Sequence, residues 1–253
     1  MEPELCVTLD IDWAPDFAID DAAARLEAHG VRATWFVTHR SPAVDRLRER
    51  PDCFELGLHP NFLPGSTHGD TPRQVLAHCL ALVPGARAMR SHGLVQSTAL
   101  LDTIIRETPL EVEATPLLPR TPHLRPFLYP WAGRELVRVP SCFEDDLEME
   151  RAAPDFGLAS LLALGPGLVV LIFHPIHLAL NSASMVPYRR VQALAASLQS
   201  LRRDQAAPEV NPGRGARSLF EEALAHLAAR GGGRRISDVA ADARRAGGDH
   251  AAP

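Results

Sequence analysis

Apolar and polar residues alternate along this chain with two different periods. Stretches that are fully apolar, or that alternate with a period of two, predict strands over residues 5–13, 32–37, 53–58, 86–89, 110–114, 136–139 and 168–173. Stretches with apolar residues at helical spacing predict helices over residues 19–29, 41–50, 71–83, 97–107, 187–203, 218–230 and 236–245. Because strands and helices alternate, we expect an α/β fold with a mostly parallel sheet.

The strand predicted over residues 168–173 is apolar on both faces, as in a parallel sheet that helices cover. No Gly-rich phosphate loop opens a predicted helix, so a barrel-like wrap of six or seven strands is favoured over a doubly wound nucleotide-binding sheet. Residues 115–130 contain five prolines and are expected to be irregular; whether they form a lid is left open. We expect one catalytic domain over residues 1–245 and a disordered tail over residues 246–253.

The stretch Leu5–Trp13 carries the first chemical signal. In a strand, Asp10 and Asp12 lie on the same face, opposite Val7, Leu9 and Ile11. Two neighbouring carboxylates repel each other unless a cation, a proton or a strong donor holds them. Solvated aspartates that cap the next helix are one interpretation, and a cation site with a base beside it is the other, which we favour.

Composition limits the possible functions. The chain has 253 residues, is 46% hydrophobic and has a net charge of −5, which argues against a general nucleic-acid binder. The N-terminus lacks a signal-peptide pattern, and the apolar stretch 161–173 is interrupted at 165–167, so we expect a cytoplasmic protein without membrane insertion. Four scattered cysteines suggest neither disulfides nor a cysteine zinc site.

Polar residues follow most of the predicted strands at their carboxyl ends. They are Asp10, Asp12, His39, His59, Arg90–His92, Glu144–Asp146, His174 and His177. The carboxyl ends of parallel strands form one rim, where ligands bind in α/β folds. A single histidine after a strand is more often a loop residue bonded to backbone, but several on one rim predict a site.

The residue types on this rim suit a divalent metal. Imidazole nitrogens with a carboxylate oxygen suit Zn²⁺, Co²⁺, Ni²⁺ or Fe²⁺ and leave positions open for water and substrate. The preferred ligand set is Asp12, His59 and His68. A metal bound at such a site lowers the pKa of its bound water and polarises a carbonyl, as amide or ester hydrolysis requires. We therefore expect a hydrolase.

Four motifs resemble those of the polysaccharide deacetylases, the NodB-homology enzymes of carbohydrate esterase family 4. The motifs are Thr8–Asp12, Glu55–His59, Arg90–Gly93 and Leu171–Pro175, and the resemblance extends over residues 5–178. It is greatest to an uncharacterised branch associated with bacterial surface-polysaccharide genes. The resemblance implies a distorted, incomplete (β/α) barrel of about seven parallel strands and the removal of N-acetyl groups, or less readily O-acetyl groups, from sugars.

The resemblance also implies roles for individual residues. Asp10 would be the general base and Arg90 the arginine that pairs with it. Asp12 and His59 would be metal ligands. Asp145 or Asp146 would orient the acid, and His174 would be that acid, protonating the leaving amine.

The sequence departs from the family pattern in the second motif. That motif usually carries a second histidine one helical turn after the first, but Leu63 stands four residues after His59. We expect His68 to replace the missing ligand, with His92 and His177 as the substitutes.

The expected substrate is an acetylated sugar or a nucleotide- or lipid-linked sugar, and Arg120, Arg125 and Arg134 are candidates for binding its phosphate. Two other functions compete with this one. One is a metal-dependent amidohydrolase that acts on a small non-sugar amide or imide, and the other is an inactive sugar-binding barrel. The sugar, the metal and the oligomeric state are left open.

Overall fold

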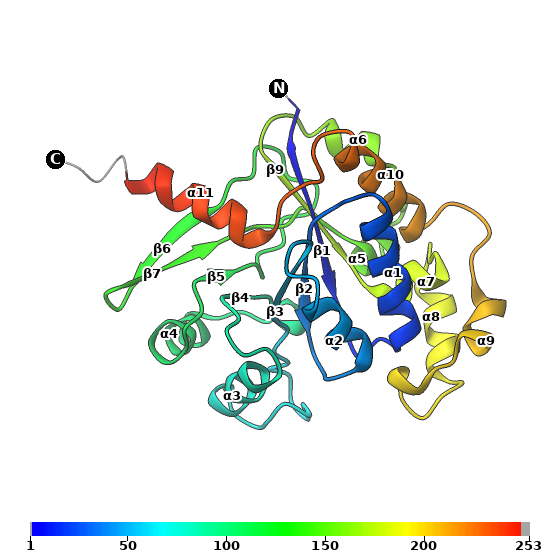
Figure 1. The fold of residues 1–253 in the computed structure, drawn as a ribbon, viewed down its shortest axis with the longest axis horizontal. Helices are drawn as coiled ribbons and strands as arrows, with labels where there is room; N and C mark the ends of the chain where they lie inside the picture. The colour runs from blue at the N-terminus through cyan, green and yellow to red at the C-terminus, as the bar shows by residue number, and fades with distance from the viewer. Residues whose placement is uncertain (1, 249–253) are drawn as a thin grey trace.

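One curled sheet of nine strands organises the part of the chain that the computed structural model describes, residues 2–248. The strands are β1 (Glu4–Asp10), β2 (Ala33–Val37), β3 (Phe54–Leu58), β4 (Ala88–Met89), β5 (Val112–Glu113), β6 (Phe127–Trp131), β7 (Arg134–Arg138), β8 (Phe143–Glu144) and β9 (Leu168–Phe173). Their order is β6-β7-β5-β4-β3-β2-β1-β9-β8, and only β6 and β7 pair antiparallel. The sheet forms an open half-barrel (Figure 1), which confirms the expected incomplete barrel, with nine strands instead of about seven.

Helices and short 3₁₀ turns surround this sheet. They are α1 (Asp16–Ala28), α2 (Pro42–Arg48), α3 (Pro72–Leu82), α4 (Thr98–Glu107), α5 (Asp145–Met149), α6 (Leu158–Leu162), α7 (Pro175–Leu180), α8 (Met185–Gln192), α9 (Arg203–Ala206), α10 (Ala216–Ala228) and α11 (Ile236–Gly248), with 3₁₀ turns η1 (His92–Leu94), η2 (Leu198–Ser200) and η3 (Ala207–Glu209). Ser41, Thr71 and Ser97 cap α2, α3 and α4 by accepting hydrogen bonds from backbone N–H groups. On β1, Leu5, Val7 and Leu9 face this helical layer and belong to the main core.

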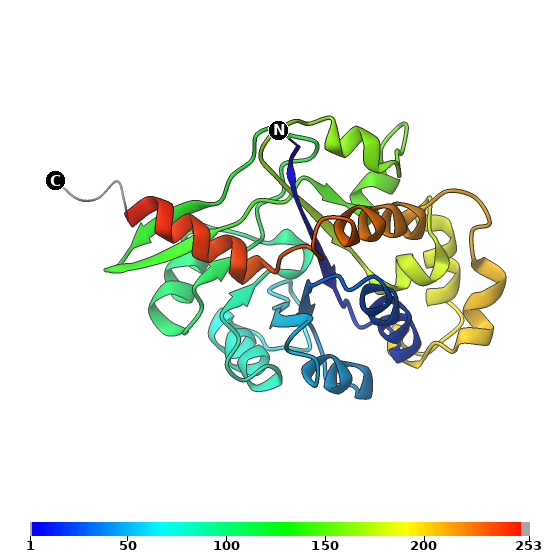
Figure 2. The same ribbon diagram turned by 45° about the horizontal axis from the view of Figure 1, so that its top comes forward.

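The inner face of the half-barrel is closed at one end by α11. This helix packs against β5, β6 and β7 (Figures 1 and 2). Its Ile236 and Val239 join Cys6, Phe36 and Val170 from the strands in a second apolar cluster. The amino-terminal end of the barrel is therefore filled, which leaves the carboxyl-terminal rim for polar side chains.

Three predicted elements differ from the structure. The first strand ends at Asp10 instead of Trp13, because Asp12 and Trp13 adopt positive φ angles of 44° and 54°. The helix predicted over residues 187–203 ends at Gln192, and the Ser200 hydroxyl donates to the Ser197 carbonyl in a separate turn. Residues 127–130, expected to be irregular, belong to β6, where Pro130 is tolerated because β6 is an edge strand.

The short helices α5, α6 and α7 and the two-residue strand β8 were not predicted. They are too short for their apolar periodicity to be recognised. At the other extreme, α11 continues to Gly248, into the segment predicted as a tail; residues 249–253 of that segment lie outside the described residues.

The proline-rich segment 115–130 does not cover the rim. Arg120 fixes its middle by donating to Glu148 and to Ser160. Further along, the Leu124 carbonyl accepts a hydrogen bond from Leu168 at the start of β9, the end of the sheet opposite the rim. The segment is therefore a fixed connection along the outside of the barrel.

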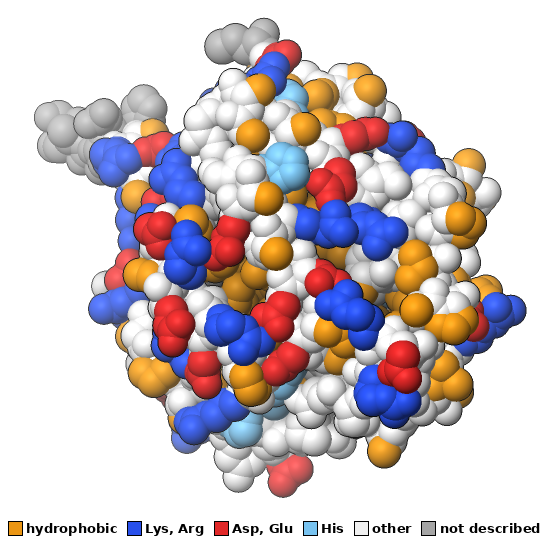
Figure 3. Space-filling view, turned by 45° about the vertical axis from the view of Figure 1, so that its right-hand side comes forward, with side chains coloured by type: hydrophobic (Ala, Val, Ile, Leu, Met, Phe, Trp, Pro, Cys, Tyr) orange, Lys and Arg blue, Asp and Glu red, His pale blue; other side chains and the backbone are white. Residues whose placement is uncertain are grey.

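Charges on the surface are mostly paired. On the face shown in Figure 3, arginine and acidic side chains are interleaved instead of gathered by sign. Arg46 with Asp20 and Arg203 with Asp21 are examples, each with a shortest N–O distance of 2.6 Å. No helix among the described residues is long and apolar enough to cross a membrane.

Gly57 in β3 provides a test of the packing inside the barrel. A Cβ at this position would lie 2.8 Å from Cδ1 of Phe36 and 2.9 Å from the backbone oxygen of Ala88. We expect Gly57→Ala to lower the free energy of unfolding by about 1–3 kcal/mol, measured by urea denaturation. Gly213→Ala is the control, because its Cβ would meet its nearest atom, Oδ1 of Asn211, at 3.4 Å. Equal stability of the two variants would contradict this account of the packing.

Candidate active site

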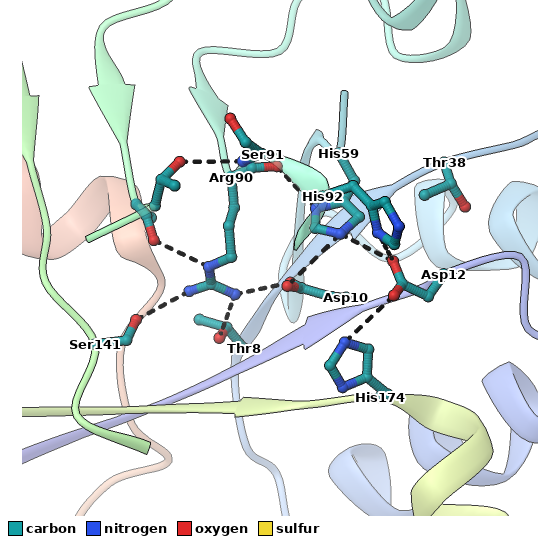
Figure 4. Close-up of polar contacts among 12 residues, drawn as sticks. Thr8, Asp10, Asp12, Thr38, His59, Arg90, Ser91, His92, Ser141 and His174 are labelled. Atoms are coloured by element: carbon teal, nitrogen blue, oxygen red, sulfur yellow. Dashed lines mark hydrogen bonds and ion pairs between the residues drawn. The ribbon is translucent and has the colours of Figure 1, made fainter. Parts of the chain in front are cut away.

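The site lies on the carboxyl-terminal rim, where β1 stops being a strand. The Asp12–Trp13 turn is held by a hydrogen bond of 3.0 Å from the Trp13 N–H to Oγ1 of Thr38, just after β2. Since Asp12 lies in this left-handed turn, its side chain is not constrained by the strand alternation that the sequence suggested. The turn directs the Asp12 carboxylate toward histidines from other strands (Figure 4).

Asp12, His59 and His92 present a group of donor atoms that lie within 4.8 Å of one another. Oδ1 of Asp12 is 2.9 Å from Nε2 of His59 and 3.0 Å from Nδ1 of His92. Nδ1–H of His59 donates to the Arg90 carbonyl at 2.8 Å, which directs Nε2 toward Asp12 and the site. Two imidazoles and one carboxylate suit a divalent transition metal.

Electrostatics within this group favour an ionised carboxylate. Burial alone would raise the pKa of Asp12, but the charge and hydrogen bonds of His59 and His92 hold it well below its usual range. Burial alone would lower the pKa of His92. The hydrogen bond between His92 and Asp12 outweighs the effect of burial, so the pKa of His92 is raised. The Asp12 carboxylate is therefore ionised, as a ligand of a cation must be.

His68 lies outside this group and is held by the backbone. Its Nε2–H donates to the Thr38 carbonyl at 2.8 Å, and its Nδ1 accepts from the Asn61 N–H at 3.1 Å. Both ring nitrogens are thus engaged in fixing the loop between β3 and α3. The ring of His68 is buried, stacked on His78 with 4.9 Å between ring centroids.

Of the two substitutes for His68, only His92 reaches the group. It stands in η1, where Gly93 with φ 60° allows the chain to turn back toward Asp12. His177 is buried elsewhere, its Nδ1 3.2 Å from the Ser182 hydroxyl, and burial lowers its pKa to about 4. The motif Arg90–Gly93 was the available signal for His92.

Arg90 is fully buried beneath the site and connects several parts of the barrel. Its guanidinium donates to Oδ1 of Asp10 at 2.7 Å, to the Thr8 hydroxyl at 2.9 Å, to the Ala114 carbonyl at 3.0 Å and to the Ser141 hydroxyl at 3.3 Å. The sequence did not identify Thr8 or Ser141 as partners of Arg90. Oδ2 of Asp10 remains turned toward the rim, 3.8 Å from Nε2 of His59. Figure 4 shows this network.

His174 approaches Asp12 from the other side. Its Nε2 is 3.5 Å from Oδ2 of Asp12, and its Nδ1–H donates to Oδ1 of Asp145 at 2.6 Å. Oδ2 of Asp145 accepts a hydrogen bond from the backbone N–H of His174 at 2.9 Å. Burial would lower the pKa of His174, but the charges of Asp145 and Asp146 raise it well above its ordinary value. Asp145, and not Asp146, thus contacts the ring of His174.

Glu144 and Asp146 flank His174 with further carboxyl groups. One donor atom from each of these three residues lies within 4.8 Å of the others. Burial and the neighbouring Asp146 raise the pKa of Glu144 to about 8, and burial raises that of Asp146. This side of the site therefore carries carboxyl groups that bind protons readily.

Comparisons with known proteins identify the family of the chain. The family model of WbmS-like polysaccharide deacetylases matches residues 7–192. A crystal structure from Bordetella bronchiseptica, WbmS, named as a candidate polysaccharide deacetylase involved in O-antigen biosynthesis, has 33% sequence identity and a TM-score of 0.75, covering 88% of this chain and 90% of that chain. A search of curated proteins finds no match.

Two further structures are matched at lower identity. A CE4-family pseudoenzyme of Bacillus anthracis has 12% identity and a TM-score of 0.47, covering 94% of this chain and 66% of that chain. A family 4 acetyl xylan esterase of Clostridium thermocellum, solved with a cobalt ion, has 11% identity and a TM-score of 0.43, covering 93% and 89%. The family match over residues 7–192 and the 33% identity to WbmS show that this chain belongs to the WbmS-like polysaccharide deacetylase family.

Proposed function

We propose that this protein is a metal-dependent deacetylase that hydrolyses the N-acetyl group of a sugar, or of a nucleotide- or lipid-linked sugar. One observation carries the proposal: a donor set of Asp12, His59 and His92 lies between two differently supported acid–base groups. Asp10 is supported by Arg90 on one side, and His174 by Asp145 on the other. Hydrolysis of an amide needs a base and an acid in such positions.

In this proposal Asp12, His59 and His92 hold the metal, with zinc the first candidate and cobalt, nickel or iron(II) the others. The bound ion would polarise the acetyl carbonyl and make water a better nucleophile. His92 takes the place that the sequence analysis gave to His68, because both nitrogens of His68 are engaged by backbone groups. The proposed ligands come from three different strand ends, so their spacing is set by the sheet.

Asp10 would act as the general base through Oδ2. Its Oδ1 is engaged by Arg90, while Oδ2 faces the donor set near His59. Arg90 fixes the carboxylate in one orientation through this charge-assisted hydrogen bond. A proton taken from water would therefore reside on Oδ2.

His174 would act as the general acid through Nε2. Asp145 fixes the ring by accepting the proton of Nδ1 and stabilises the imidazolium, so the proton at Nε2 is the one that can be given away. That atom faces the Asp12 carboxylate from the side opposite His59, where the leaving amine of a bound acetamido group would lie.

The metal ligands can be tested with two histidine variants. His92→Ala should lower zinc affinity more than about 100-fold, since even changes outside the ligand shell cost about 10–100-fold. His68→Ala should keep near-stoichiometric metal, measured by elemental mass spectrometry after purification without chelator. The reverse pattern, with metal lost only in His68→Ala, would contradict the proposed ligand set.

The base can be tested by Asp10→Asn. This change should lower kcat about 10²–10⁴-fold in an acetate-release assay while metal content is retained. Ser141→Ala is the matched control, since it removes another contact of Arg90 without removing the carboxylate. A wild-type rate in Asp10→Asn would show that another group is the base.

The acid can be tested through the pH dependence of kcat. The protonated form of His174 is the active form, and Asp145 raises its pKa. Asp145→Asn should therefore lower that pKa and move the alkaline limb of the kcat profile to lower pH. Asp146→Asn, which removes a charge but no hydrogen bond to the ring, should give a smaller shift in the same direction. An unchanged alkaline limb in Asp145→Asn would mean that His174 is not the acid.

A further inference from the structure

A cavity of about 880 Å³ opens beside the candidate active site on the same rim. Its volume lies within the range of about 300–1,000 Å³ that is typical of ligand pockets. Its walls come from the ends of β2 and β3, from α3 and from η2. Its lining includes Trp13, Arg40, Asn61 and His78.

Trp13 is the wall that this cavity shares with the active site. Its ring lies 5.2 Å from that of His92, one of the proposed ligands, and 5.4 Å from that of His68, which lines the cavity. A molecule that placed an acetyl group at Asp12 and extended past Trp13 would enter the cavity. The indole ring is a large surface with both apolar and polar character, suited to contact with a sugar.

Three side chains that line the cavity, those of Arg40, Asn61 and His78, have donor groups that the described residues leave partly or wholly free. Arg40 makes one hydrogen bond, to the Ala81 carbonyl at 3.1 Å, and no ion pair among the described residues. Among the described residues, Nδ2 of the Asn61 side chain and the ring nitrogens of His78 have no hydrogen-bond partner. The lining contains no aspartate or glutamate, although the chain as a whole is acidic. The cavity thus offers positive charge and free N–H groups.

The three arginines that the sequence suggested for phosphate binding do not line this cavity. Arg120 is paired with Glu148 at 3.0 Å. Arg134 donates to the carbonyls of Ile105, Thr108 and Leu110. Arg125 lies at another cavity, which Glu4 and Asp242 also line. Arg40, by contrast, lines the cavity next to the active site. Because it has no carboxylate partner among the described residues, it is available for an anion.

We propose that this cavity binds an anionic group of the substrate, a carboxylate or a phosphate, held mainly by Arg40. The inference rests on the proposed function, because it assumes that the acetyl group of the same molecule is bound at Asp12. A guanidinium presents parallel N–H groups that match the two oxygens of a carboxylate or phosphate. The substrate would then be an acidic acetamido sugar or a sugar linked through phosphate.

Binding to the metal-loaded protein tests this with three probes that share the acetamido sugar. They are neutral N-acetylglucosamine, its 1-phosphate and the corresponding uronic acid, compared by isothermal titration calorimetry. We expect at least one anionic probe to bind about tenfold more tightly than the neutral sugar. Tighter binding of the uronic acid alone would identify a carboxylate, and of the 1-phosphate alone a phosphate.

Two arginine variants separate the cavity from the metal as the cause of this preference. Arg40→Gln should remove most of the preference, bringing the affinity for the anionic probe toward that for the neutral sugar. Arg46→Gln is the matched control, because Arg46 is exposed, pairs with Asp20 and does not line the cavity. No preference in the wild type, or the same preference in Arg40→Gln, would overturn the inference.

Acetate release from the same probes reports separately on the proposed function. Anion preference that depends on Arg40, without acetate release from any probe, would support the cavity as an anion site and contradict deacetylation of these sugars. Acetate release without any preference that depends on Arg40 would support the deacetylase and overturn the cavity assignment.

Discussion

The charged guanidinium of Arg90 is buried at the rim end of the barrel, so the residues around it must supply hydrogen-bond acceptors and an opposite charge. It is fully buried over the ring of Phe36, 4.4 Å from the ring centroid, where an unpaired charge would be strongly unfavourable. Asp10, Thr8 and Ser141 provide its partners, and they come from different segments of the chain. The same contacts that make the charge tolerable also hold Asp10 in one orientation. Support of the proposed base is thus a consequence of packing the barrel interior.

The turn after β1 complements this constraint. A left-handed φ is unfavourable for residues other than glycine, and two successive residues, Asp12 and Trp13, adopt it here. The turn brings the Asp12 carboxylate between histidines, with Oδ1 toward His59 and Oδ2 toward His174. It also places the Trp13 ring between the active site and the neighbouring cavity. A regular strand would have directed these two side chains to opposite faces of the sheet.

The sequence was most informative where a pattern is both local and long. The strands at residues 5–10 and 168–173 follow from periodicity, and the parallel sheet then gathers Asp10, His59 and His174 on one rim without knowledge of any contact. The two-residue strand β8 and the five-residue helix α5 carry too little pattern. Strand β6 was missed, although its partner β7 was predicted at residues 136–139, because prolines, which an edge strand tolerates, are also typical of loops.

The choice between His68 and His92 shows why the site could be predicted only in part. Both histidines follow strands that end on the same rim, and sequence alone gives them equal access to Asp12. Two backbone features separate them: the Thr38 carbonyl, 30 residues away in the chain, engages His68, whereas Gly93, the next residue, turns His92 inward. The same reasoning applies to the arginines: Arg120 and Arg40 are chemically identical, but among residues 2–248 a carboxylate pairs with Arg120 and none pairs with Arg40. Which polar groups are left free for a ligand is decided by long-range pairing, and local sequence patterns do not contain it.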